Sequence, residues 1–408
     1  MNRLKTLLFK YQDVFFPVFD VLLNGFNFFM HIYISWFISM NDYSILNALL
    51  SLLAILFVMG ISIQTYTNKE VGKAQNQGSI ASSIFSLLVI IMMVVNGVLL
   101  IFMPVIMTFM RTNIINVILI MLIFDVNIML SFFRGLMQGR QMFLKLNISF
   151  YIEVITKLIF VIAVLPFFGG TVVPLGGILV GMLFSFGHAF LLLHKELDLG
   201  IRFSKKLKDV FKTLVHVIWS NFFLYYLTSI SLIMANYYIG EQAGLYAVSL
   251  KFSQLILAVG LSVITVLVSY SSGLVEDKVE FHHYITKWLI RFCLGSIVII
   301  GGYQLILRHM IGFLFGDAYA GAKEFMVIQA FAYILLTISY YIISIMIILN
   351  EKVHLYILAV VSGLLTIGLI LNHGTIQSII TIEVISFAIL FIGLLIWFVQ
   401  KRRQNESA

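Results

Sequence analysis

Residues 59–65 read MGISIQT and residues 259–265 read VGLSVIT, so one pattern of apolar, glycine, serine and threonine positions occurs once in each half of the chain. Each copy lies late in an apolar run that follows a short acidic turn. A chain that repeats itself in two halves within a membrane is most often a transporter. The repeat therefore favours a duplicated membrane protein with a transport role.

The composition supports a membrane protein along the whole chain. Hydrophobic residues make up 61% of the sequence, charged residues 11%, and the mean hydropathy is +1.05. Apolar stretches long enough to cross a bilayer core of about 30 Å recur from end to end. We expect twelve transmembrane helices, at about 14–39, 44–66, 80–103, 114–133, 147–166, 175–194, 214–238, 243–270, 286–307, 323–348, 353–372 and 376–399. The sequence predicts an all-α polytopic membrane protein.

The distribution of basic residues predicts the orientation of these spans. Connections on the side of the N-terminus carry most of the 26 lysines and arginines, whereas the opposite side carries Arg111, Arg308 and Lys323. Basic residues are retained on the cytoplasmic side during insertion. We therefore expect both termini in the cytoplasm, which requires an even number of spans. Retention and attraction to anionic membrane lipids explain the positive net charge without a nucleic-acid partner.

A second pair of matching segments extends the repeat. Residues 136–140 and 348–352 both read apolar, apolar, amide, variable, basic, and both stand at the end of a predicted span. Because six spans is an even number, both halves run in the same direction, as in a parallel repeat. We expect two six-helix lobes around a central cavity. The predicted division is 1–200 for the N-terminal lobe, 201–213 for a basic amphipathic cytoplasmic linker, 214–400 for the C-terminal lobe and 401–408 for a basic cytoplasmic tail.

A polar stripe runs along the first predicted span. Asp20, Asn24, Asn27, His31 and Ser35 follow helical spacings of three and four and share one face. We interpret this face as a wall of a hydrated cavity that could bind substrate, with Asp20 as a proton or cation site. The alternative is a set of interhelical hydrogen bonds that hold the bundle together.

Charged residues also occur inside spans 4 and 5, where each costs about 2.5–3.5 kcal/mol in hydrocarbon and needs a partner or a cavity. Glu153 and Lys157 are four residues apart, in the order that favours a helical ion pair. They form a self-neutralised structural pair, or Lys157 faces an anionic substrate while Glu153 tunes it. Span 4 carries Asp125 and ends near Arg134. We list Asp125 and Glu153 as further ion-coupling candidates, and Lys157 and Arg134 as substrate-binding candidates.

The repeat also points to one lysine. Lys251 shares a face of span 8 with Ser262 and Thr265, and it stands where span 2, which carries Ser62, has Ser51. A cation therefore occurs in one half only, at a face that both halves share. We predict that Lys251 contacts phosphate or sugar-acid groups of a substrate, with the serines and threonine lining the same cavity.

No catalytic, metal or cofactor motif accompanies these residues. The sequence contains no P-loop, no nucleophile elbow and no zinc-protease signature, and its one cysteine, Cys293, has no partner for a disulfide. Glu383 in the last span and Arg291 near the inner end of span 9 are the other intramembrane charges, and Arg291 is placed to extend to the interface. We expect no cofactor and no enzymatic activity.

Three segments carry connection motifs between predicted spans: 235–247 (ANYYIGEQAGLYA) between spans 7 and 8, 314–322 (LFGDAYAGA) between spans 9 and 10, and 133–140 (FRGLMQGR) between spans 4 and 5. In these three segments the chain resembles the bacterial polysaccharide flippases of the multidrug/oligosaccharidyl-lipid/polysaccharide (MOP) superfamily. The usual proline early in span 7 is missing here, where residues 216–220 read HVIWS.

The resemblance implies a flippase that moves undecaprenyl-diphosphate-linked oligosaccharide to the outer leaflet of the bacterial plasma membrane by alternating access, for surface polysaccharide synthesis. Its implied partners are the lipid-linked oligosaccharide, membrane lipids and polysaccharide polymerase or assembly proteins. A cation-coupled multidrug exporter of the same superfamily is the main alternative. A glycan polymerase or ligase fits less well, because its outer loops are typically large and charged, and the outer connections here are short.

Overall fold

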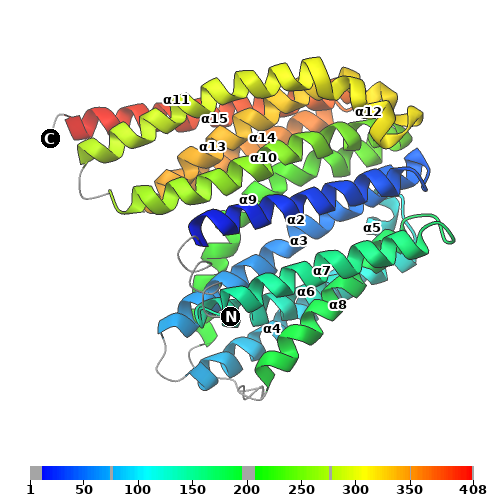
Figure 1. Cartoon of the computed structure of the whole chain (residues 1–408), viewed down its shortest axis with the longest axis horizontal. Coiled ribbons are helices and arrows are strands. Elements are labelled where there is room, and N and C mark those ends of the chain that lie inside the picture. The colour runs from blue at the N-terminus through cyan, green and yellow to red at the C-terminus, as the bar shows by residue number, and fades with distance from the viewer. Residues whose placement is uncertain (1–11, 74–76, 195–206, 275–277, 350, 407–408) are drawn as a thin grey trace. The chain divides into compact units, whose positions relative to one another are not determined.

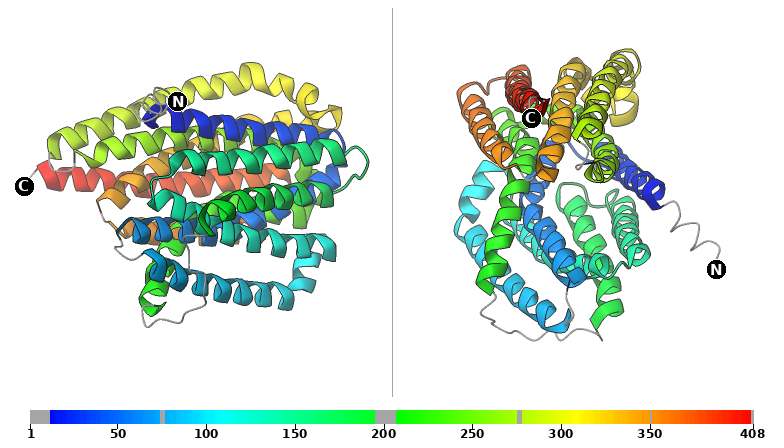
Figure 2. Two further views of the ribbon diagram at one scale, coloured as in Figure 1. Left: turned by 60° about the horizontal axis from the view of Figure 1, so that its bottom comes forward. Right: turned by 90° about the vertical axis from the view of Figure 1, so that its left-hand side faces the viewer.

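The computed structural model describes residues 12–73, 77–194, 207–274, 278–349 and 351–406, and no strand occurs among them. The long helices run lengthwise beside one another within each part of the chain (Figures 1 and 2). The helices are α2 Gln12–Ser35, α3 Met40–Lys73, α4 Gln77–Ile101, α5 Met103–Phe109, α6 Ile114–Gly139, α7 Phe143–Val164, α8 Val172–Leu193, α9 Leu207–Ile239, η2 Gly240–Gln242, α10 Ala243–Ser272, α11 Lys278–Gly302, η3 Tyr303–Leu307, α12 Arg308–Phe315, η4 Asp317–Glu324, α13 Met326–Ile348, α14 Val353–Leu371 and α15 Ile376–Glu406.

These helices account for each of the twelve predicted spans. Ten described segments are long and apolar enough to cross a membrane. One of the ten, Asn221–Val268, contains two helices, α9 and α10, and the described part of α2 adds the shorter apolar segment Val21–Ser35. The chain is an all-α, multi-pass membrane protein.

The chain forms two compact units, which are treated separately below. The C-terminal unit consists of Met1–Ile32 and Gln242–Ala408, and the N-terminal unit of Tyr33–Glu241. These units differ from the lobes expected from the sequence at two helices, because most of α2 belongs with α10–α15 and α9 belongs with α3–α8. Residues 195–206, which include the first part of the predicted linker, lie outside the described residues, and residues 207–213 already belong to α9. The predicted tail is helical as far as Glu406, as a continuation of α15.

The α9 helix is tied to the N-terminal unit by polar contacts at one of its ends. The Ser44 hydroxyl of α3 donates hydrogen bonds to Asn236 Oδ1 at 2.9 Å and to the Gly240 carbonyl at 3.0 Å. Asn236 in turn donates to the Met110 carbonyl, and the Arg111 guanidinium donates to the carbonyl of Tyr237. Satisfied buried amides of this kind are costly to break, so they hold α9 against α3.

The repeated glycines sit at equivalent contacts in the two units. In the N-terminal unit, Gly60 of α3 faces Asn127 and Ser131 of α6 so closely that a side chain there would collide with them. In the C-terminal unit, Gly260 of α10 faces Thr337 of α13 in the same way. The helices α6 and α13 are spans 4 and 10, which correspond in the repeat. Small residues let helix backbones approach closely in a membrane. The repeated motif therefore marks a close helix contact that occurs once in each unit, between α3 and α6 and between α10 and α13.

Candidate functional site

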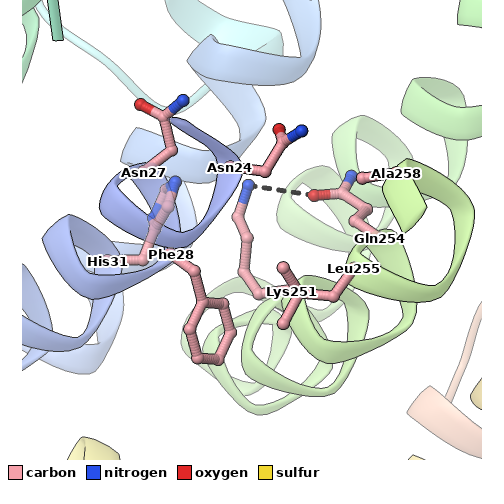
Figure 3. A pocket seen from close by; sticks show the side chains of 8 residues that line it. All are labelled: Asn24, Asn27, Phe28, His31, Lys251, Gln254, Leu255 and Ala258. Carbon is pink, nitrogen blue, oxygen red and sulfur yellow. Dashed lines mark hydrogen bonds between the residues drawn. The ribbon is translucent and has the colours of Figure 1, made fainter. Parts of the chain in front are cut away.

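A pocket of about 140 Å³ opens between α2 and α10 within the C-terminal unit (Figure 3). Its lining consists of Asn24, Asn27, Phe28 and His31 from α2, and Lys251, Gln254, Leu255 and Ala258 from α10. Both sets follow helical spacings of three and four, so one face of each helix supplies the lining. The lining combines one ammonium group, one imidazole and three carboxamides with the apolar side chains of Phe28, Leu255 and Ala258.

Lys251 is the charged group at the centre of this pocket. Its Nζ donates a hydrogen bond to Gln254 Oε1 at 3.2 Å. Figure 3 shows the ammonium pointing into the space between Gln254 and Asn24. Among the lining residues there is no carboxylate. The described lining therefore presents positive charge and amide groups, a combination that suits anionic and hydroxyl-rich ligands.

An aromatic cluster supports the same region. Phe28 of α2 packs edge-on against Phe252, with ring centroids 5.0 Å apart, and against Phe315 of α12 at 5.9 Å. The rings of Phe252 and Phe315 are 5.7 Å apart. Aromatic pairs at these distances contribute about 0.5–1.5 kcal/mol beyond the area that they bury. They hold the pocket face of α2 against the residue that follows Lys251.

Four of the predicted site residues meet in this pocket: Asn24, Asn27, His31 and Lys251. Asp20 lies on α2, but its side chain falls outside the described residues. The polar stripe of the first span thus lines the same pocket as Lys251 of span 8, the lysine that has no counterpart in the other half of the repeat. Their role in binding stays a prediction.

The predicted hydroxyl residues do not line the pocket. Ser62 donates its hydroxyl hydrogen to the carbonyl of Val58, 2.8 Å away. Ser262 and Thr265 do the same on α10, toward Ala258 and the carbonyl of residue 261. Serine and threonine in helices commonly bond to the carbonyl four residues earlier. These three hydroxyl groups are therefore partnered within their own helices, and their role in substrate binding stays a prediction.

Arg134, a predicted substrate-binding candidate, is enclosed by three helices of the N-terminal unit. Its side chain is 6% exposed, and its Nη2 lies 2.7 Å from Glu153 Oε2 of α7. The guanidinium also donates to the Ser149 hydroxyl at 3.1 Å and to the Ser185 hydroxyl of α8 at 3.1 Å, and it stacks over the Phe150 ring at 3.9 Å. This arrangement is a structural clamp between α6, α7 and α8.

Glu153 has a second basic neighbour besides the predicted Lys157. The sequence suggested an ion pair with Lys157 on the same helix, whereas the ion pair in the structure joins Glu153 to Arg134. Lys157 is buried where α7 and α8 approach closely, and a side chain at Gly181 would collide with the Glu153 carbonyl and the Lys157 side chain. The charge of Glu153 also acts on Lys157, so this carboxylate interacts with both basic residues.

Asp125, the third ion-coupling candidate, lies on α6 and pairs with an amide. Asn96 Nδ2 of α4 donates to both carboxylate oxygens, at 2.8 and 2.9 Å. Both side chains are half-buried. The structure places Asp125, Glu153 and Lys157 in the N-terminal unit, and Lys251 in the C-terminal unit.

Two polar contacts of the C-terminal unit were not predicted from the sequence. Gln254 holds the Lys251 ammonium, and the only signal for it is its spacing of three from Lys251. Glu383 was noticed as an intramembrane charge but received no role. It is 1% exposed and accepts a hydrogen bond from the Tyr246 hydroxyl at 2.7 Å. No pattern within one helix links residues that lie so far apart in the chain.

Solved structures share this architecture. An inward-facing multidrug resistance MATE family transporter of the MOP superfamily aligns with a TM-score of 0.74 over 96% of this chain and 99% of its own, at 12% identity. The lipid II flippase MurJ, in an inward closed conformation, aligns with a TM-score of 0.76 over 94% of this chain and 87% of its own, at 14% identity.

A MOP superfamily transporter from Pyrococcus furiosus aligns with a TM-score of 0.60 over 96% of this chain and 95% of its own, at 13% identity. The fold is that of MOP superfamily transporters. At 12–14% identity, the similarity to these MOP superfamily proteins shows the fold alone. No protein-family model matches the sequence, and no similar curated protein was found.

Proposed function

We propose that this protein is a flippase that moves undecaprenyl-diphosphate-linked oligosaccharide from the cytoplasmic to the outer leaflet. The proposal combines the MOP fold with the chemistry of the α2–α10 pocket. One of the solved structures with a similar fold is the lipid II flippase MurJ. The proposal extends a lipid-linked substrate to the protein described here. The substrate, the direction and the role in surface polysaccharide synthesis are parts of the proposal.

The observation that carries the proposal is the lysine in a pocket lined by amides. A glycan-lipid headgroup presents a diphosphate and many hydroxyl groups. The Lys251 ammonium can bind a phosphate oxygen as a point charge. The carboxamides of Asn24, Asn27 and Gln254 each offer donors and acceptors that match sugar hydroxyls. A pocket of about 140 Å³ is smaller than a whole oligosaccharide. It therefore serves as a subsite that binds one chemical group of the headgroup.

Alternating access explains how such a subsite would transport its ligand. In the proposed mechanism the charged headgroup leaves the inner leaflet and binds Lys251, while the isoprenoid tail stays in the hydrocarbon. Binding favours the conformation that makes better contacts with the headgroup. The same site then opens to the outer side and releases the headgroup there.

The experiment is a liposome assay with purified protein and defined lipid-linked oligosaccharides, run with and without a proton or sodium gradient. Lys251→Gln removes the charge and keeps most of the side-chain volume. Lys323→Gln is the matched control, because Lys323 is exposed in η4 of the same unit. We expect Lys251→Gln to slow translocation at unchanged protein level and the control to behave as wild type. Equal rates for all three proteins would remove Lys251 from the substrate path.

A cation-coupled multidrug exporter is the second candidate, favoured by the likeness to a MATE transporter over nearly the full length of both chains. A cationic drug would be repelled by Lys251. Export of cationic dyes by cells that express the protein, unaffected by Lys251→Gln, would support the exporter. Dye retention together with translocation of lipid-linked oligosaccharide would support the flippase.

A further inference from the structure

An acid and an amide meet between two helices of the N-terminal unit, close to the middle of a transmembrane helix. Asp125 lies about 16 Å along α6 from its start at Ile114. Asn96 lies on α4, and its Nδ2 donates to both carboxylate oxygens of Asp125, at 2.8 and 2.9 Å. One amide nitrogen therefore serves both oxygens of the acid.

The oxygen of the same amide is left without a hydrogen bond. Asn96 Oδ1 is buried and accepts no hydrogen bond within the described part of the chain. The hydrogen bonds of the Asp125 carboxylate, among the same residues, come from Asn96 alone. A buried carbonyl oxygen without a donor costs free energy, and so does an ionised acid in a membrane without a cation beside it. The ionised pair thus lacks one donor that both of its members could use.

A proton on Asp125 would supply this donor. A neutral carboxylic acid has one O–H group and one carbonyl oxygen, and a carboxamide has the complementary carbonyl oxygen and N–H group. A rotation of the Asn96 amide about its last side-chain bond lets the acid donate to Oδ1 while Nδ2 donates to the acid carbonyl. The step forms one O–H bond, takes up one proton and releases no group. The neutral pair then has two complete hydrogen bonds and no charge.

The surroundings of the pair make Asp125 the group whose charge can change at this contact. The helix α6 packs against α3, α4, α5, α7 and α8, and α4 and α5 contain no ionisable residue. The other charged residue of α6 is Arg134, which is paired with Glu153. The ionisable side chains described on α3, α7 and α8, among them Lys157 and His188, make no bond with Asp125.

We propose that Asp125 and Asn96 form a proton-binding site, and that the proton it takes up and releases is coupled to translocation. The coupling rests on the proposed function, whereas proton binding by the pair is independent of any substrate. Coupling requires that the two protonation states favour different conformations of the protein. The pair joins α4 to α6, and its two states are two different hydrogen-bonded arrangements of that joint. A simpler role is a fixed hydrogen bond between the two helices, in which Asp125 keeps one protonation state.

The first test is an infrared titration of the full-length protein in lipid bilayers, between about pH 3 and pH 9. A protonated carboxyl group has a carbonyl stretching band that an ionised one lacks. We expect a component of this band to appear as the pH falls and to be lost in Asp125→Asn. Glu241→Gln is the control and should keep the component, because Glu241 is an exposed acid of the same unit.

A second variant tests the hydrogen bonds of the neutral pair. Asn96→Leu replaces the amide by an apolar side chain of similar size. The band component of Asp125 should then move to higher frequency, because the acid carbonyl loses the N–H donor that weakens its double bond. Spectra of Asp125→Asn that match the wild type at every pH would overturn the proton site. If Asp125→Asn does not fold, a band that Asn96→Leu leaves in place would overturn it.

The coupling is tested in liposomes that contain lipid-linked oligosaccharide, with and without an imposed proton gradient. The gradient should change the translocation rate of the wild type and of Glu241→Gln, and Asp125→Asn should lose this response. An equal response in Asp125→Asn and wild type, or a wild type that translocates without any response, would overturn the coupling. Failure of the wild type to translocate the lipid would count against the proposed function alone, since the infrared titration still tests the proton site.

Discussion

Arg134 of the N-terminal unit and Lys251 of the C-terminal unit are cations within apolar helices, and their surroundings differ. Arg134 of the N-terminal unit is enclosed by Glu153 and by serines of two helices, and its donors point at protein groups. Lys251 of the C-terminal unit bonds to one amide and faces a pocket. The comparison shows that an intramembrane charge gains a role from its partners and not from its presence in a span. The enclosed cation stabilises the fold, and the one beside the pocket is available to a ligand.

The largest expected effect comes from breaking the enclosed cation. Arg134→Ala leaves the half-buried Glu153 carboxylate without this ion-pair partner, and breaking a buried ion pair typically costs about 3–5 kcal/mol. We expect a lower unfolding temperature in detergent and a lower protein level. Arg134→Met combined with Glu153→Leu removes both charges and should recover much of the loss. A stable Arg134→Ala protein that fails only in transport would instead place Arg134 in the substrate path.

Replacement of Lys251 should weaken the binding of an anionic ligand and change the stability of the protein only slightly. Lys251→Gln removes a charge-assisted contact, which is typically worth about 1.5–3 kcal/mol, or about 10- to 100-fold in affinity for an anionic ligand. Its unfolding temperature should stay within a few degrees of wild type. A large drop in that temperature would show that Lys251, like Arg134, is mainly structural.

Glycine contacts within the N-terminal unit predict an intermediate effect. A Cβ at Gly135 of α6 would lie 2.7 Å from the Gln64 carbonyl oxygen of α3. We expect Gly135→Ala to cost about 1–3 kcal/mol through overpacking, measured as a lower unfolding temperature. Gly97→Ala is the control, because a Cβ at Gly97 would have no neighbour within 4 Å. Equal behaviour of the two variants would contradict close packing of α3 on α6.

The smallest effect is expected for Ser262, the serine that corresponds to Ser62 in the repeat. Ser262→Ala removes a bond from the serine side chain to its own helix, toward the Ala258 carbonyl. Because such a bond contributes little to helix stability, stability and transport should both stay close to wild type. A transport defect in Ser262→Ala would show that the repeated serine reaches the substrate in another conformation of the protein.

Much of the fold could be predicted from the sequence, because the bilayer constrains it locally. Span length, charge distribution and the glycine motif all depend on residues close in the chain. The same holds for the stripe of Asn24, Asn27 and His31, whose helical spacing predicted a shared face. These three residues do line one pocket in the structure, together with Lys251.

The rest of the site depends on contacts between helices, which spacing along one helix does not reveal. Glu153 has a candidate partner one turn away on α7, and the ion pair forms with Arg134 of α6. Glu383 of α15 accepts a hydrogen bond from the Tyr246 hydroxyl of α10. The placement of α9 in the N-terminal unit also depends on long-range bonds, such as the one between Ser44 and Asn236.

The most direct test of the central claim is the affinity of the purified protein for farnesyl diphosphate compared with farnesol, which has the same tail without the charge. Wild-type protein should bind the diphosphate more tightly than the alcohol, and Lys251→Gln should lose about tenfold or more of the diphosphate affinity with no change for the alcohol. Equal affinities of Lys251→Gln and wild type for the diphosphate would contradict the account.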